Sequence, residues 1–192
     1  RGLIPIPVRY YAAHTGRWGG DDKINIQNLP SRGVNGKKLK SSIIAPVGYT
    51  LVDCDSSQIE ARVLAWLAGQ DDLVQAFTNN EVSMSREEAG ALGTNNLLTY
   101  RDNSIKLPSG LRMRYGDLDY EQGERGLEFS YMTRRGRTRI YGGKVTENVC
   151  QAIARCIMGE QMLAIAKRYK PVLTVHDSVV CCVPDDELDE AR

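Results

Sequence analysis

Residues 51–62 read LVDCDSSQIEAR, and residues 172–180 read VLTVHDSVV. In each stretch an aspartate stands at the end of a short, apolar, β-prone run. It is Asp55 in the first stretch and Asp177 in the second. If the fold brings these two ends together, their carboxylates would form a site for two divalent cations. Asp53 shares the strand face of Asp55, because side chains two residues apart point the same way. We treat Asp53 as a weaker metal candidate and favour a plain strand-edge acid.

The charge balance leaves nucleic acid open as a partner. The chain has 192 residues, 42% of them hydrophobic, and 25 basic against 24 acidic side chains. That length fits one domain with a sizeable core. A net charge of +1 does not exclude nucleic acid, since a local basic stripe is what contacts phosphates. One basic stretch fits both phosphate contact and a solvated, arginine-rich strand and turn. It comprises Arg134, Arg135, Arg137, Arg139 and Lys144.

The cysteines point to a reducing compartment. Their number is odd and no Cys-x-x-Cys spacing occurs, so neither a disulfide framework nor a zinc site is indicated. Reduced, buried thiols suit a reducing, intracellular compartment. The sequence shows no signal peptide and no apolar run long enough to span a membrane. It begins at Arg1 without a methionine, and we expect it to be a piece of a longer protein. The cysteines are Cys54, Cys150, Cys156, Cys181 and Cys182.

The first half of the chain predicts a strand followed by a helix. Residues 50–54 form the expected strand. The helix should begin at Ser57, with Ser56 or Ser57 as its cap, and end near Gly69.

The second half predicts β-rich structure over 105–141 and then the longest helix over 145–169. Its apolar stripe includes Leu163, and Pro171 stops it. Strands at 172–175 and 179–183 should flank a tight turn. The order of elements predicts an α+β fold in which helices back an antiparallel sheet.

Several motifs together resemble the family A DNA polymerases. Residues 55–62 resemble motif A of that family, and residues 176–178 resemble motif C. Residues 15–17 and 25–30 are similar to the segment before motif A. Tyr141-Gly142-Gly143 and the helix after it resemble the phage version of the helix that precedes motif C. The resemblance covers nearly the whole chain except about 78–104, and four matches in the family's order make it specific.

The resemblance implies a palm domain over 1–192 that performs template-directed DNA synthesis. Asp55 and Asp177 would be the catalytic residues and would bind two Mg2+ ions, with the Ser56 carbonyl as a further ligand. Magnesium suits such a site because it takes hard oxygen ligands and few protein carboxylates. The partners implied are primer–template DNA and deoxynucleoside triphosphates, with accessory replication proteins unknown and no membrane. The location implied is the cytoplasm of a bacterial or phage-infected host cell.

The resemblance also implies which residues hold the substrates. Gln58, Ile59 and Glu60 would bind the nucleotide, with Glu60 as a steric gate against the sugar 2′-hydroxyl. Without the resemblance, Glu60 is an ordinary first-turn helix acid. The residues that would contact DNA are Arg17, Gln27, Asn28, Asn148, Gln151 and His176. For Gln151 a polar helix position, and for His176 a turn histidine, are the alternatives, and we assign His14 to structure.

The chain departs from the family pattern in three places. Motif B, the fingers helix that grips the triphosphate, is not found. Residues 78–104 are short and Asn-rich, and we take the similarity of residues 135–142 to motif B as coincidence. Ser178 stands where motif C has Glu, and Ser56 stands where motif A has an aromatic. The implied fold therefore lacks most of the fingers and the thumb.

Three functions fit the sequence. The first is an active, two-metal DNA polymerase palm. The second is a catalytically incomplete palm fragment that binds primer–template DNA without turnover, because a missing fingers helix weakens both triphosphate binding and leaving-group stabilisation. The third is a different palm-like nucleotidyl transferase or cyclase, against which Glu60 and the Gln27-Asn28-Leu29-Pro30 segment argue.

Overall fold

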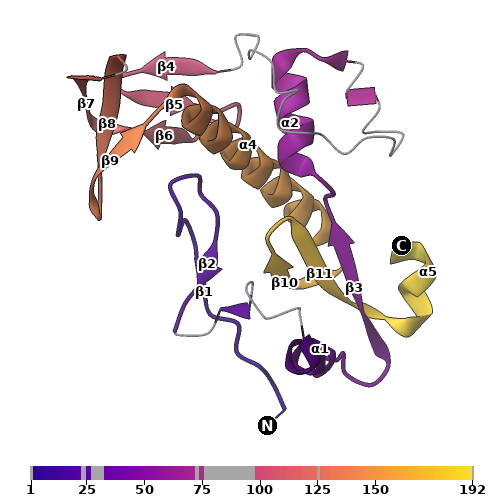
Figure 1. Ribbon diagram of the computed structural model, residues 1–192. Coiled ribbons are helices and arrows are strands. Elements are labelled where there is room, and N and C mark those ends of the chain that lie inside the picture. The colour runs from indigo at the N-terminus through magenta and orange to yellow at the C-terminus, as the bar shows by residue number, and fades with distance from the viewer. Residues whose placement is uncertain are drawn as a thin grey trace. The chain divides into compact units, whose positions relative to one another are not determined.

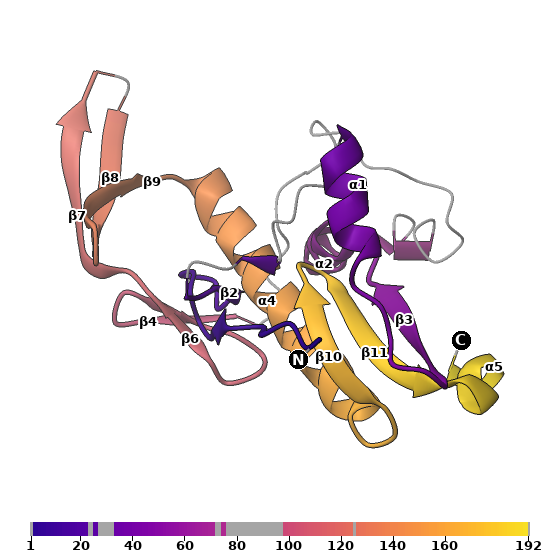
Figure 2. The same ribbon diagram turned by 90° about the horizontal axis from the view of Figure 1, so that it is seen from below.

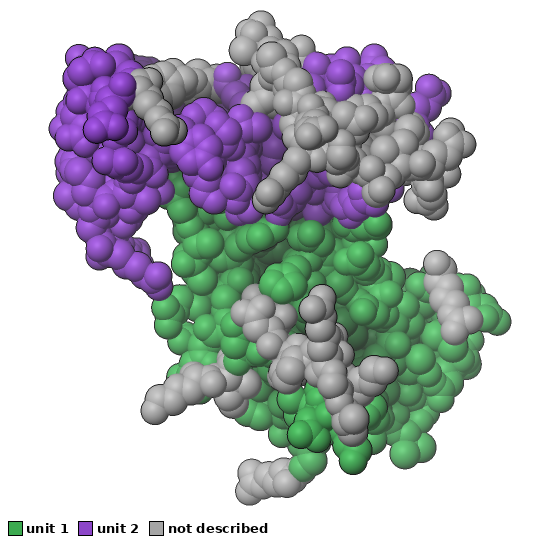
Figure 3. Space-filling view, in the orientation of Figure 1, with its two compact units in different colours: residues 1–57, 155–192 green, residues 58–154 purple. Residues whose placement is uncertain are grey.

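The computed structural model (Figure 1) describes residues 2–22, 25–26, 33–71, 74–75, 98–124 and 126–191. It contains two compact units, coloured separately in Figure 3. Unit 1 comprises residues 1–57 and 155–192, and unit 2 comprises residues 58–154. The single palm domain over 1–192 stays a prediction, since most of 78–104 lies outside the described residues.

Unit 1 is built on a three-stranded antiparallel sheet with the order β10-β11-β3 (Figure 2). The strands are β3 (Tyr49–Asp55), β10 (Lys170–Val175) and β11 (Ser178–Pro184). Both the predicted strand and the predicted hairpin are confirmed. They form because each run contains β-branched residues, Thr50 and Val52 in the case of β3, and a two-residue turn closes the hairpin. In this order β11 is central and β3 lies at an edge.

The C-terminal part of α4 (Gly142–Ile165) backs this sheet. Met158 packs with Val179, Cys181 and Val183, which are alternate residues of β11 and so share one face. Val52 of β3 packs against the same cluster. The predicted α+β arrangement, with an antiparallel sheet backed by a helix, is therefore confirmed.

The predicted apolar stripe of this helix was wrong at its end. Leu163 is 71% exposed, whereas Met162 and Ile165 pack against the core. Residue 163 lies about 140° around the helix from Met158, at 100° per residue, so it points away from the sheet. The helix also ends at Ile165 rather than near 169. Pro171 disfavours a helical residue before it, and β10 already begins at Lys170.

Short elements complete unit 1. Strands β1 (Val8–Arg9) and β2 (Gly19–Gly20) pair antiparallel. Helix α1 spans Gly33–Ser41, and the chain ends in a 3-10 turn, η2 (Asp185–Glu187), and α5 (Leu188–Ala191).

Unit 2 contains α2 (Ile59–Ala68) and two antiparallel three-stranded sheets. The β-rich character predicted for 105–141 is confirmed. The first sheet comprises β4 (Thr99–Arg101), β5 (Ser104–Lys106) and β6 (Arg112–Arg114). The second comprises β7 (Gly116–Gly123), β8 (Gly126–Thr133) and β9 (Gly136–Ile140).

Helix α2 ends as predicted but begins differently. Gly69 closes it in the left-handed conformation, with φ of 68°. At the other end the cap is Gln58, which is itself left-handed with φ of 53° and makes no side-chain capping bond. The expected cap at Ser56 or Ser57 was therefore wrong, and the Ser56 hydroxyl donates to Gln161 instead. Within the described residues, no helix is both long and apolar enough to cross a membrane.

Candidate active site

Asp55 and Asp177 lie at the same end of two adjacent strands. The pairing of β3 with β11 sets Asp55 directly opposite Ser178, the residue after Asp177. The Ser56 backbone N–H donates to the Asp177 carbonyl over 2.8 Å. This bond continues the ladder beyond the last strand pair, so the turn that carries Asp177 is held against the end of β3. Asp55 is exposed and the Asp177 side chain is 30% exposed, so both carboxylates can reach a ligand from solvent.

Arg17 supplies a positive charge beside this pair. Its Nη2 lies 3.9 Å from Oδ1 of Asp177, and the Arg17 side chain is 35% exposed. A tight turn holds the arginine in place: the N–H groups of Ala12 and Ala13 donate to its carbonyl, and Gly16 before it has φ of 78°.

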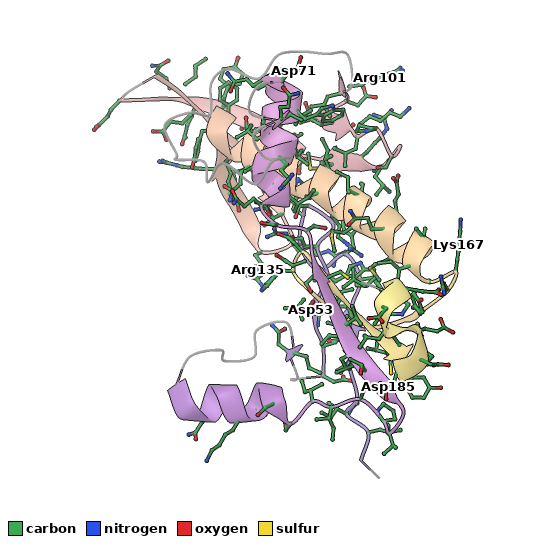
Figure 4. The ribbon with its side chains drawn as sticks, turned by 90° about the vertical axis from the view of Figure 1, so that its right-hand side faces the viewer. Asp53, Asp71, Arg101, Arg135, Lys167 and Asp185 are labelled. Carbon is green, nitrogen blue, oxygen red and sulfur yellow. The ribbon has the colours of Figure 1, made fainter. Side chains whose placement is uncertain are left out.

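Asp53 and Ser178 are joined on the same face of the sheet as Asp55. Ser178 Oγ donates to Oδ1 of Asp53, which lies on β3 (Figure 4). Because Ser178 is opposite Asp55 in the ladder, all three side chains start from one face. Asp53 is thus tied to the position where motif C of the family carries Glu. Its role as a metal ligand remains a prediction.

A concavity of ≈ 310 Å³ adjoins Asp55 on the side of α4. Its lining includes Cys54, Asp55 and Ser56 of the β3 end and Gln161 of α4. Ser56 Oγ donates to Gln161 Oε1 over 3.1 Å. Sequence reasoning missed Gln161, because nothing in a helix pattern tells which exposed polar residue will face a strand end 105 residues away.

Trp18 anchors the N-terminal segment of unit 1. Its ring meets Tyr10 edge-on, with centroids 4.7 Å apart, and the Arg155 guanidinium lies 3.9 Å from its centroid. Burial lowers the pKa of Arg155. Burial likewise lowers the pKa of His14, which is consistent with the structural role that we assigned to it.

The remaining predicted site residues fall in several places. His176 is exposed in the turn before β11, with φ of 51°. Asn148 is 6% exposed, and its Nδ2 lies 3.4 Å from the Tyr115 hydroxyl as a donor. Gln151 donates to Glu147 Oε1 over 3.2 Å.

The predicted nucleotide-binding residues open α2, whose first turn contains Glu60 as the only acid. Gln58 is its cap and Ile59 its first residue. These three, with Asn148 and Gln151, belong to unit 2, whereas Arg17, Asp55, Ser56, His176 and Asp177 belong to unit 1. Gln27 and Asn28 lie outside the described residues.

The donor set at the strand ends fits Mg2+. Two carboxylates, from Asp55 and Asp177, and a main-chain carbonyl, from Ser56, are hard oxygen ligands of the kind this ion takes alongside substrate phosphates. In the described ranges, no group of three or more His, Cys, Asp or Glu side chains is arranged to hold an ion. A site of two carboxylates is sufficient for an ion that keeps several waters.

The chain is similar in sequence to known DNA polymerases. Residues 7–86 match the family described as DNA polymerase family A. DNA polymerase I of Pseudomonas aeruginosa is 43% identical over 79 residues, which are 41% of this chain and 8% of that protein. The thermostable DNA polymerase I of Thermus filiformis is 25% identical over 236 aligned positions, which cover 94% of this chain and 28% of that protein. The chain thus spans less than a third of either relative.

The fold agrees with a solved polymerase structure. The polymerase domain of Pol1 from M. smegmatis, in complex with DNA primer-template and dNTP, superposes with a TM-score of 0.59. The match covers 98% of this chain and 43% of that one, at 18% identity. The fold is therefore that of part of a polymerase domain. These matches confirm the resemblance to the family A DNA polymerases that the motifs predicted.

Proposed function

We propose that this chain is the palm of a template-directed DNA polymerase, which adds deoxynucleotides to a primer 3′-hydroxyl with two Mg2+ ions. One observation carries the proposal. The pairing of Asp55 with Ser178, and the bond from the Ser56 N–H to the Asp177 carbonyl, set two aspartates from distant parts of the chain at adjacent strand ends. Two solvent-accessible carboxylates so arranged are what such a site needs.

The residues of unit 1 have separate roles in this proposal. Asp55, Asp177 and the Ser56 carbonyl hold the ions, which when bound supply Lewis-acid activation of the primer hydroxyl and stabilise the charge on the phosphates. Arg17 helps to orient the Asp177 carboxylate, since its Nη2 lies 3.9 Å from Oδ1 of that residue. Gln161 holds the Ser56 side chain at 3.1 Å, which steadies the backbone next to Asp55.

Residues of unit 2 and of the turn would hold the substrates. Gln58, Ile59 and Glu60 are proposed to bind the incoming nucleotide, with Glu60 excluding a 2′-hydroxyl. Arg17, Gln27, Asn28, Gln151 and His176 are proposed to contact the primer–template. Asn148 belongs to the same set, but its bond to Tyr115 shows that it also has a structural role.

A second candidate function is a palm that binds primer–template DNA without turnover. The observation in its favour is the lack of motif B: in this sequence no Arg, Lys and aromatic pattern ending in Tyr-Gly occurs in residues 78–103, between motifs A and C. Without cations on the triphosphate, leaving-group stabilisation would depend on the metal site alone.

Primer extension with Mg2+ and all four deoxynucleotides tests the proposal, with Asp55→Asn beside the unsubstituted chain. Asp189→Asn, an exposed change of the same chemistry on α5, is the matched control. We expect extension by the chain and by Asp189→Asn, and none by Asp55→Asn, with duplex binding kept in all three. Equal extension by Asp55→Asn would refute the two-aspartate site. Duplex binding with no extension by any of the three would favour the inactive palm.

A further inference from the structure

The sheet β4-β5-β6 of unit 2 carries its cationic side chains on one face. Its register sets Arg101 opposite Ser104, Ser104 opposite Arg114, and Lys106 opposite Arg112. Residues directly opposite in a ladder project to the same side, as do residues two apart in a strand. Arg101, Lys106, Arg112 and Arg114 therefore share one face. All four are exposed.

The other face of the sheet is apolar. Ile105 pairs with Met113, which is 1% exposed and lies between the two arginines of β6. Met113 is buried whereas the four cationic side chains are exposed, so the cationic face is the one turned to solvent. A hairpin turn with two left-handed residues, Asp102 and Asn103, sets the register of β4 with β5.

The cationic face is concave. A hollow of ≈ 480 Å³ is lined by Arg101, Arg112 and Arg114 together with Asp102 and Asp117. Figure 4 labels Arg101, which lies at the end of β4.

Contacts within the hollow leave its arginines available to a ligand. Arg112 Nη1 donates over 3.2 Å to Oγ of Ser104, which is 4% exposed, and this bond orients the guanidinium. Arg101 Nε lies 3.4 Å from Oδ2 of Asp102, with 76% and 85% of the two side chains exposed. A pair so exposed contributes little to stability, so a phosphate can take the place of the aspartate.

We propose that this face binds the phosphate backbone of a single DNA strand. Guanidinium groups match phosphate oxygens in charge and in planar, two-point geometry. The face measures about 7 Å between Arg112 and Arg114 and about 10 Å from β4 to β6. That extent is wide enough for a short stretch of the backbone of one strand.

None of the residues proposed for catalysis belongs to the cationic face. It also differs from the basic stretch 134–144 that the sequence singled out. The inference rests on the proposed function only in naming DNA, since the recognition itself is of phosphate.

Salt dependence of binding tests the inference. The probe is a fluorescein-labelled oligothymidine, which offers phosphates without base pairs, and anisotropy gives its affinity over a series of NaCl concentrations. Each phosphate contact on a single strand contributes about 0.7 to the slope of log affinity against log salt. Arg112→Gln with Arg114→Gln should therefore reduce the slope by about 1.4, whereas the two Lys substitutions at the same positions should largely preserve it.

Two further variants separate the site from general charge and from folding. Lys167→Gln with Lys170→Gln removes the same charge from two exposed positions of unit 1 and should leave the slope unchanged. Arg101→Gln with Arg114→Gln keeps the bond from Arg112 to Ser104 and should again reduce the slope. An unchanged slope in both arginine pairs, or an equal fall in the lysine control, would overturn the inference.

The salt dependence of binding can be interpreted independently of the primer-extension assay. If extension fails while the slope still depends on the arginines, the inference stands and the proposed function falls. If Asp55→Asn alone abolishes extension while the arginine pairs bind with an unchanged slope, the proposed function stands and the inference falls.

Discussion

Met158→Ala tests whether α4 holds the sheet that carries both aspartates. Met158 is 1% exposed and packs on Val179, Cys181 and Val183 of β11. The change removes three heavy atoms from the core, which costs about 2.4 kcal/mol at roughly 0.8 kcal/mol per buried methylene-sized group. The remaining cavity adds to this, so we expect the free energy of unfolding to fall by about 3 kcal/mol, within the usual range of roughly 2–5 kcal/mol.

The assay is urea unfolding followed by tryptophan fluorescence. The chain has two tryptophans, Trp18 in unit 1 and Trp66 in unit 2. In a Trp66→Phe background, Trp18 alone reports unit 1, where its ring stacks with Arg155. A lower midpoint with an unchanged denaturant slope identifies a loss of stability rather than a change in the unfolded state.

Leu163→Ala is the matched control, because it truncates the same helix at a side chain that is 71% exposed. It should change the free energy of unfolding by no more than about 0.5 kcal/mol. Met158→Leu, which keeps the volume, should cost less than about 1.5 kcal/mol. A loss below about 1 kcal/mol in Met158→Ala, or equal losses at 158 and 163, would refute the packing of α4 on this sheet.

Three other predictions concern thiols and glycines. Burial raises the pKa of Cys150 to about 11. Because the thiolate is the reactive form of a cysteine, a thiol reagent at mildly alkaline pH should label the exposed Cys54 and spare Cys150. Mass spectrometry of the peptides would show which cysteine is labelled. Because this pKa is raised in the folded state, the neutral Cys150 thiol contributes to the free energy of unfolding. The contribution is complete below the ordinary pKa of 9.0 and is lost as the pH rises towards 11. Over that pH range the urea midpoint should therefore fall less in Cys150→Ala than in the unsubstituted chain. Gly69→Ala places a side chain at φ of 68° with open space around it, and it should lower the free energy of unfolding by about 1–2 kcal/mol. Gly159→Ala, inside α4 and also with open space, should raise the free energy of unfolding by about 0.5–1 kcal/mol. Stability changes of the same sign in thermal unfolding would contradict the backbone conformation at these two positions.

Local patterns in the sequence predicted much of the fold. The strand at 50–54, the hairpin around His176 and Asp177, and the β-rich segment before α4 depend on β-propensity and turn residues, which act between near neighbours. The stop of α2 at Gly69 also depends on a single residue that accepts positive φ. These features could be predicted because a residue and its nearest neighbours decide them.

The same local rules failed where a distant partner decided the outcome. Leu163 was predicted to belong to the apolar stripe of its helix. The position of β11 decides which face of α4 is buried, and Leu163 lies outside that face. Ser56 looked like a helix cap, but its N–H bonds to the Asp177 carbonyl and its hydroxyl to Gln161. Gln58 takes the cap in its place at φ of 53°.

The sequence by itself determined that Asp55 and Asp177 each end a strand, that family A motifs surround them, and that a helix follows the first. Only the tertiary structure decided that Asp55 stands opposite Ser178, that Ser178 bonds to Asp53, and that four cations share one face of β4-β5-β6. The reason is that strand register depends on pairing between segments far apart in the chain, 125 residues in the case of Asp53 and Ser178, and a shift of one residue would turn every side chain to the opposite face.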